Sequence, residues 1–186
     1  SFFPAKPLGC YGDGGALFTG STEKAEIYRS LRSHGKGSEK YEVKRIGVNS
    51  RLDTIQAAIL LAKLEIFEDE IIARENLARK YSSLLSRVVE VPHLISGAKS
   101  VWAQYTIKCK NREKLISFLS SQNIPTAIYY PRPMHLQEAY KSFGDGINSL
   151  PISENLSQEV LSLPMHPYMK EEVFDRITKA ILSSGV

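Results

Sequence analysis

The longest periodic pattern in the sequence runs from Asp53 to Leu85, and it constrains the fold more than any other feature. Its apolar residues recur at the spacing of one helix face, and others lie on the remaining sides. We therefore expect a long helix whose first half is buried nearly all round. The order Asp53-Thr54-Ile55-Gln56 has the form of a capping box, which marks the helix start. A cluster of acids interrupts the pattern near its middle, so this helix, bent there, is typical of a connection between two domains.

Shorter elements are expected on both sides of this helix. Residues 15–19 favour a short buried strand, and Ser21 or Thr22 caps a helix that ends at Gly35. Beyond Pro92 the pattern changes to alternating short elements. It predicts a strand at residues 102–109, a helix at 112–122, a strand at 126–130, and helices at 153–162 and 170–182. The fold class is therefore α/β.

The composition is that of an ordinary folded protein of 186 residues, with 42% hydrophobic and 24% charged residues and a net charge of +4. Cys10 and Cys109 match no metal or redox spacing, and we interpret them as buried thiols of a cytoplasmic protein. The four histidines show no ligand spacing, so no metal site is expected. No apolar run approaches the ~20 residues of a spanning helix, so no membrane partner is expected.

Lys6 lies between Pro4 and Pro7, a stiff and apolar setting for a long charged side chain. Apolar surroundings disfavour the ammonium form, so such a lysine can lose its proton near neutral pH and attack an aldehyde. Ser1 could place a hydroxyl beside a phosphate near that amine. The alternative from spacing alone is a lysine whose stem lies along the surface with its charge in water. The glycines that follow fit neither a Rossmann motif nor a P-loop.

The block Ser1-Phe2-Phe3-Pro4-Ala5-Lys6-Pro7-Leu8-Gly9, with Tyr11-Gly12-Asp13-Gly14-Gly15-Ala16 after it, is the most distinctive motif. It resembles the lysine segment of the DegT/DnrJ/StrS-type nucleotide-sugar aminotransferases, which use pyridoxal phosphate on the fold-type I scaffold. The resemblance continues through residues 32–35, 47–53, 56–58 and 163–167, and so covers essentially the whole chain. It implies the C-terminal part of that fold: residues 1–68 as a remnant of the large cofactor-binding domain, and residues 69–186 as the small α/β domain.

The resemblance also implies roles for individual residues. Lys6 would hold the cofactor covalently and move the proton during amino transfer, and Ser1 would bind the cofactor phosphate. Asn49 would reach the phosphate of the neighbouring subunit's cofactor, which makes the protein a homodimer with shared active sites. The alternative for Asn49 is a cap at a helix entry.

Three further residues are implied to bind substrate. Arg51 is matched in the uronic-acid branch of the family, where it would bind the sugar carboxylate, because a guanidinium offers two parallel donors to a carboxylate. The alternative is an ordinary surface ion pair. Tyr129 and Tyr130 align with the segment that meets the sugar nucleotide from the partner subunit, and many relatives have histidine where Tyr129 stands. Both tyrosines could instead be core residues at a strand end.

The implied activity is amino transfer, with glutamate as donor, to a nucleotide-linked keto sugar in surface-polysaccharide synthesis. The resemblance is closest to enzymes acting on a UDP-linked 3-keto uronic acid. Family members carry a comparable length of chain before the lysine segment, including the acid that keeps the pyridine nitrogen protonated. We therefore expect these residues to be a C-terminal half that is inactive alone.

Two other functions are alternatives to this one. One is a non-catalytic or regulatory relative of the same fold. Lys6 disfavours the dehydratase branch, because those relatives have histidine in place of the lysine. The other is a nucleic-acid-binding module on residues 23–45, but glutamates interleave with its basic residues and no recognition motif accompanies them. No nucleic-acid partner is expected.

Overall fold

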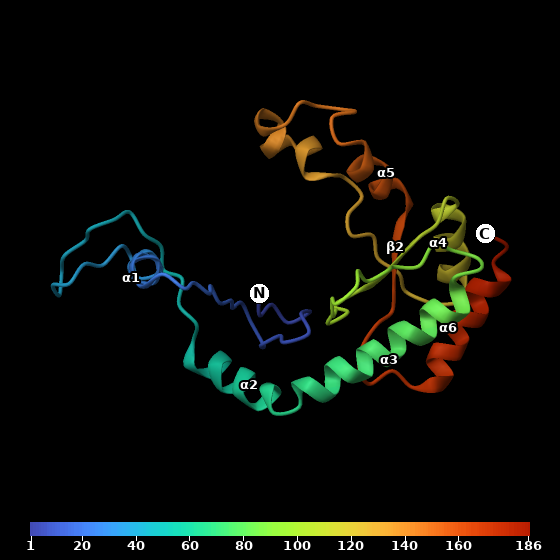
Figure 1. Ribbon diagram of the computed structural model, residues 1–186, viewed down its shortest axis with the longest axis horizontal. Helices are drawn as coiled ribbons and strands as arrows, with labels where there is room; N and C mark the ends of the chain where they lie inside the picture. Colours follow the sequence, from blue (N-terminus) through green and yellow to red (C-terminus); the bar gives the residue numbers. More distant parts are fainter. The chain divides into compact units, whose positions relative to one another are not determined.

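The computed structural model describes all 186 residues, which form two compact units, Ser1–Glu68 (unit 1) and Asp69–Val186 (unit 2). Figure 1 shows the elements of each unit, and each is described by itself. The elements of unit 1 are α1 (Thr22–Leu31), α2 (Thr54–Leu64) and the first residues of α3 (Phe67–Leu85). Residues 65 and 66 separate α2 from α3, so the long helical pattern is two helices rather than one bent helix.

Helix α1 begins at the signal read from the sequence, but it ends at Leu31, before the predicted stop at Gly35. Ser21 is its N-cap, and the side-chain oxygen of Ser21 accepts a hydrogen bond from the Lys24 amide at 3.2 Å. Past its end, Gly35 has a φ of 73° and donates its N–H to the Ser30 carbonyl at 2.9 Å. A Cβ at position 35 would lie 1.6 Å from the Arg45 carbonyl oxygen, so only glycine fits there.

Two expectations for local structure in unit 1 are wrong. Residues 15–19 form no strand, and Phe18 within them is 93% exposed. The side chain of Asp53 makes no capping bond to α2. Gln56 does not reach back to the helix start, because its side-chain oxygen accepts a hydrogen bond from the distant Tyr11 amide at 2.8 Å.

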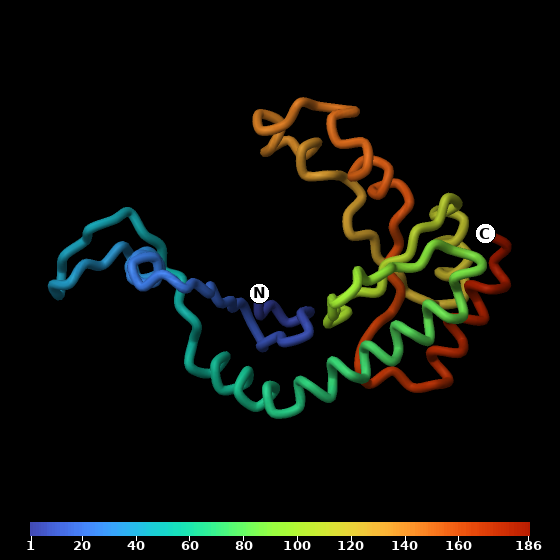
Figure 2. Tube along the Cα trace, viewed as in Figure 1, coloured from blue at the N-terminus to red at the C-terminus, as the bar shows by residue number.

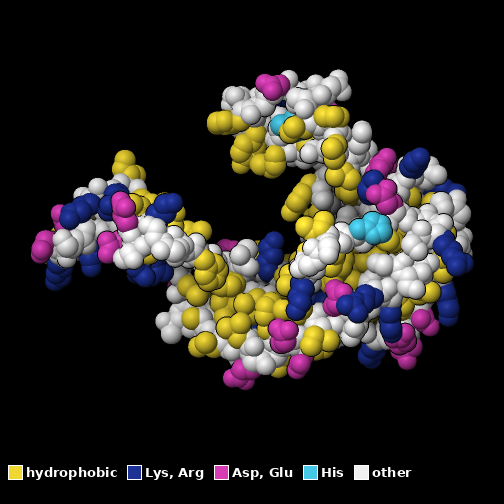
Figure 3. All heavy atoms as spheres, in the orientation of Figure 1, with side chains coloured by type: hydrophobic (Ala, Val, Ile, Leu, Met, Phe, Trp, Pro, Cys, Tyr) yellow, Lys and Arg dark blue, Asp and Glu magenta, His cyan; other side chains and the backbone are white.

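Helix α2 is also much more exposed than its sequence predicts. Only Leu60 is buried in it, and Ile55 and Leu61 are 74% and 66% exposed. Figure 3 shows apolar side chains at the surface over this helix. The physical reason is that Cys10 and Leu60 are the only buried apolar side chains of unit 1, so the other apolar faces of α2 have no partner within the unit.

Unit 2 holds the rest of α3 and a two-stranded antiparallel sheet of β1 (Tyr105–Lys108) and β2 (Val160–Leu163), in which Tyr105 faces Leu163. Its other elements are α4 (Arg112–Ser121), the 3-10 helices η1 (Met134–Leu136) and η2 (Glu138–Phe143), α5 (Pro151–Glu159) and α6 (Glu171–Ser183). Two predictions fail here. Residues 126–130 contribute only one bridge, Ala127 to Ser162, and the helix predicted to reach residue 162 ends at Glu159, where β2 begins.

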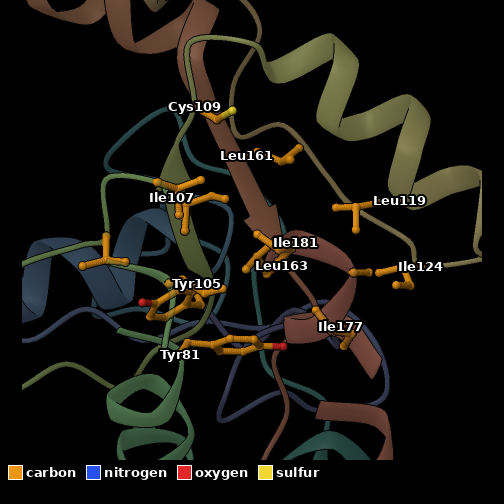
Figure 4. Packing of buried hydrophobic residues seen from close by; sticks show 14 of the residues in the cluster. Tyr81, Tyr105, Ile107, Cys109, Leu119, Ile124, Leu161, Leu163, Ile177 and Ile181 are labelled. Carbon is orange, nitrogen blue, oxygen red and sulfur yellow. The ribbon is translucent and has the colours of Figure 1, made fainter. Parts of the chain in front are cut away.

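One hydrophobic core fills unit 2, built from α3, both strands, α4 and α6. Figure 4 shows side chains of both strands, α4 and α6 gathered in this core, with Tyr105 of β1 next to Tyr81 of α3. The Tyr81 ring stacks on Tyr105 with centroids 4.9 Å apart, and its hydroxyl donates to the Pro164 carbonyl at 3.0 Å. Burial raises the pKa of both tyrosine hydroxyls. This core lies entirely within residues 77–181, so unit 2 does not need unit 1 to bury it.

Residues 131–150 leave the body of unit 2 and return through α5 to β2, as the orange part of the tube in Figure 2 shows. A carboxylate holds this loop to α5. Glu154 accepts hydrogen bonds from the Asn148 amide at 3.0 Å and the Leu150 amide at 3.2 Å. The His135 Nε2 lies 3.0 Å from the same carboxylate, and His135 is 9% exposed. The loop is therefore closed by one side chain with three partners.

The Glu154 bonds predict a pH dependence of loop stability. Hydrogen bonding from the Asn148 amide, helped by His135, holds the pKa of Glu154 below its usual value of 4.5. A carboxyl with a lowered folded pKa stabilises the fold above its unfolded pKa, and this contribution is lost as the pH falls through the folded pKa. We expect Glu154→Gln to speed amide hydrogen exchange at Asn148 at pH 6. That difference from the native protein should shrink as the pH falls through the folded pKa of Glu154.

Glu138→Gln is the matched control for this measurement, because the Glu138 side chain is 86% exposed on η2. Exchange at Asn148 that is equal in the native protein and in Glu154→Gln at pH 6 would show that the carboxylate does not hold the loop.

Candidate functional site

The segment with Lys6 is a loop that closes on itself, here called the lysine loop (residues 1–14). The Phe2 amide donates to the Gly14 carbonyl, and the Cys10 amide donates to the Phe2 carbonyl, each at 2.8 Å. Within it, the Lys6 amide donates to the Phe3 carbonyl at 2.8 Å, which makes a tight turn. Lys6 is exposed at this turn, as are its neighbours in residues 3–5, so the apolar setting read from the sequence is not present in this chain.

The interior of the lysine loop is tightly packed. Cys10 is fully buried, and its thiol lies 3.0 Å from the Phe2 carbonyl and 3.0 Å from the Gly12 carbonyl, donating to either. A Cβ at Gly9 would lie 2.7 Å from the Pro4 carbonyl oxygen, so a larger residue would displace the backbone of the turn. The prediction that Cys10 is a buried thiol is confirmed, and Cys109 is buried as well.

A pocket of about 850 Å³ lies beside the lysine loop, within unit 1. It brings together three of the residues singled out from the sequence, Ser1, Asn49 and Arg51, but Lys6 does not line it. The Arg51 Nε donates to the Asn49 side-chain oxygen at 3.0 Å, which leaves the terminal guanidinium nitrogens of Arg51 free of hydrogen bonds within the chain. A volume of this order suits a small-molecule ligand.

Two further arginines, Arg29 and Arg32, line the same pocket and were not among the predicted site residues. Their spacing of three places both on one side of α1 and its C-cap, a signal that the sequence already carried. The only acid in the lining is Asp13. Hydroxyl, amide and guanidinium donors around one hollow fit an anionic group such as a phosphate or a carboxylate.

Tyr129 and Tyr130 belong to unit 2, where they precede the 131–150 loop. Their rings meet edge to face with centroids 5.5 Å apart, and they are 43% and 68% exposed. The alternative that they are core residues is therefore wrong for this chain. Tyr129 also borders a smaller hollow of about 260 Å³ with Met165 and residues of β2.

No group of three or more histidine, cysteine, aspartate or glutamate side chains lies close enough to hold a metal ion. None of the helices combines the length and the apolar character needed to cross a membrane.

The comparison with known families matches residues 1–182 to the model of the DegT/DnrJ/EryC1/StrS aminotransferase family. The chain belongs to this family. Members are pyridoxal-phosphate-dependent nucleotide-sugar aminotransferases. The match includes the lysine loop, the pocket residues and both tyrosines, so the resemblance read from the sequence is confirmed at the level of the family and of the fold.

Individual relatives agree with this membership. A UDP-2-acetamido-2-deoxy-3-oxo-D-glucuronate aminotransferase of Pseudomonas aeruginosa is 48% identical over 91% of this chain and 46% of its own length. A pleiotropic regulatory protein of Geobacillus stearothermophilus is 43% identical over 92% of the chain and 47% of its own length. The crystal structure of a DegT/DnrJ/EryC1/StrS aminotransferase from Brucella abortus is 54% identical, with a TM-score of 0.92 over 97% of this chain and 48% of that one. The chain thus spans about half the length of the curated relatives it matches.

Proposed function

We propose that the whole protein moves an amino group from glutamate to a nucleotide-linked keto sugar, with pyridoxal phosphate as cofactor. The single observation that carries this proposal is the lysine loop, a closed main-chain loop with an exposed lysine at its tight turn, in a chain of this family. An amine in that position is free to bond to an aldehyde. The proposal places the protein in surface-polysaccharide synthesis in the cytoplasm. The two buried free thiols support the cytoplasmic location, because thiols stay reduced there.

The residues of unit 1 fit the proposed cofactor. Lys6 would bond to it and the Ser1 hydroxyl would bind its phosphate, while the Asn49 amide would reach the phosphate of the neighbouring subunit's cofactor. Three arginines in the same pocket favour an anion. The bound cofactor supplies an electron sink that makes removal of a proton from the amino donor easier. The Nζ of Lys6, released when the amine of the donor takes its place on the cofactor, would accept and return that proton. Residues 1–68 are, in this proposal, part of the large cofactor-binding domain, and residues 69–186 are the small domain.

The proposed substrate is a UDP-linked 3-keto uronic acid. The 48% identical relative from Pseudomonas aeruginosa carries that activity in its name, which supports this choice. Arg51 supports it chemically, because its terminal guanidinium nitrogens can bind a carboxylate while Nε is held by Asn49. The exposed Tyr129 and Tyr130 would contact the sugar nucleotide of the partner subunit in a homodimer with shared active sites.

A regulatory function is the second candidate, because a 43% identical relative is named as a regulatory protein. A regulatory protein of this fold does not need a reactive lysine. Lys6 therefore separates the two candidates, and its reactivity is the property to measure.

Reduction with borohydride tests the proposed function directly. Full-length protein incubated with pyridoxal phosphate and reduced should carry the cofactor on one lysine, which peptide mass spectrometry should identify as Lys6. The Lys6→Ala variant is the negative control and should carry no label there. A native protein that is labelled only on other lysines, or on none, would leave the regulatory candidate standing.

A further inference from the structure

Helix α2 presents two polar side chains to the lysine loop, and neither has a role in the proposed reaction. The Gln56 side-chain oxygen accepts a hydrogen bond from the Tyr11 amide at 2.8 Å. The Lys63 ammonium donates to the Gly9 carbonyl at 2.6 Å. Seven positions separate them, which is two helical turns, so they lie on one face of α2, with Leu60 between them as the only buried residue of the helix.

These two bonds hold main-chain atoms on either side of Cys10. The Lys63 nitrogen also lies 5.4 Å from the centre of the Tyr11 ring, a cation–π contact with the same short segment. Gly12, which follows Tyr11, also lies close to Gln56, because a Cβ at Gly12 would be 3.2 Å from the Gln56 side-chain nitrogen. Residues 9–12 are therefore fixed to a helix by three separate contacts from two side chains.

The anchored segment is in turn packed against the turn that carries Lys6. A Cβ placed on Gly9 would lie 2.7 Å from the Pro4 carbonyl oxygen and 3.0 Å from the Lys6 carbonyl oxygen, so these backbones are in direct contact. Cys10 binds the other end of the turn through the Phe2 carbonyl. A displacement of Gly9 cannot be absorbed locally, because the contact on its far side is with the main chain of the turn.

We propose that Gln56 and Lys63 are positioning residues, which set the place of the Lys6 backbone, and so the reach of its amine, by fixing Gly9 and Tyr11 to α2. This inference rests on the proposed function, because it concerns how Lys6 meets the cofactor. Lys6 itself is exposed and has no side-chain hydrogen bond, so within this chain the backbone of the turn is what sets where its side chain starts and which region its amine can reach. Chemistry that depends on alignment is sensitive to small displacements of that backbone.

The test uses the full-length protein loaded with pyridoxal phosphate and two variants, Lys63→Met and Gln56→Met, each of which removes one anchoring bond at similar side-chain length. Two readouts separate positioning from stability: the pH midpoint of the visible absorption band of the lysine-bound cofactor, and kcat and KM for the nucleotide sugar. We expect each variant to shift the midpoint by about half a pH unit and to lower kcat about 10-fold, with KM changed less than about twofold.

Matched variants make the result specific. Lys63→Arg keeps a cationic donor and Gln56→Glu keeps an acceptor, so both should recover most of the native midpoint and kcat. Lys24→Met removes an exposed lysine of α1 and should behave as the native protein. If Lys63→Met does not fold, Gln56→Met and Gln56→Glu carry the comparison alone.

Two results would count against different claims. Variants that melt at a lower temperature but keep the native midpoint and kcat would show that the contacts are only structural, which overturns the inference. A native protein without any visible band on binding the cofactor would instead overturn the proposed function.

Discussion

Replacing Arg51 with glutamine in the full-length protein should lower kcat/KM for the UDP-linked keto uronic acid by about 10- to 100-fold, the usual loss for a hydrogen bond to a charged group. The same change should leave kcat/KM for the matched neutral keto sugar within about twofold. The reason is that Arg51 lines the pocket and its Nε is already held by Asn49 at 3.0 Å, which leaves its terminal nitrogens free to bind a carboxylate. Steady-state kinetics with both sugars measures the ratio.

Arg79→Gln is the control for this variant, because Arg79 pairs with Glu75 in unit 2 and its side chain is 75% exposed. It should change neither rate. An equal loss on both sugars in the Arg51 variant would show that Arg51 binds a group common to both, such as a phosphate. An unchanged kcat/KM for both sugars would show that Arg51 is an ordinary surface residue without a role in substrate binding.

Replacing Ile107 with alanine should lower the free energy of unfolding of unit 2 by about 2–5 kcal/mol. Ile107 is fully buried on β1, at the centre of the core shared by the strands and α6. All of that core lies within Asp69–Val186, so we expect this segment to fold cooperatively when it is produced separately. Urea unfolding followed by the fluorescence of Trp102, the single tryptophan of the chain, measures the difference.

Ile152→Ala is the matched control, because it removes the same atoms from an isoleucine that is 76% exposed at the start of α5. It should cost less than about 0.5 kcal/mol. A segment that shows no cooperative transition, or two alanine variants of equal stability, would mean that the core of unit 2 is not self-sufficient.

Elements that depend on local signals could be predicted from the sequence. Helix α1 starts at its serine cap, and α4 and α6 lie within one residue of the ranges predicted from their periodicity. The errors have a common cause in distant contacts. The sequence pattern predicts a helix through residues 160–162, but these residues pair with β1, more than fifty positions earlier. The capping box failed for the same reason, because Gln56 binds Tyr11 in the lysine loop.

The candidate site could be predicted only where a motif carried it. Ser1, Asn49 and Arg51 were selected by resemblance, and the structure brings these three to one pocket, although their roles stay predictions. Gln56 and Lys63 were missed, because nothing local distinguishes a lysine on a helix that binds a loop carbonyl from one in water. Only the folded chain shows which polar side chains have a distant partner.

The scarcity of buried apolar side chains in unit 1 bears on how the polypeptide reaches its native state. Unit 2 has its own hydrophobic core and can fold by itself, whereas unit 1 leaves the side chains of Phe18, Ile46 and Ile55 exposed. Until other protein surface covers these side chains, they attract chaperones and favour self-association. We therefore expect unit 1 to self-associate when it is produced by itself, and to do so less at low temperature, where apolar association is weaker.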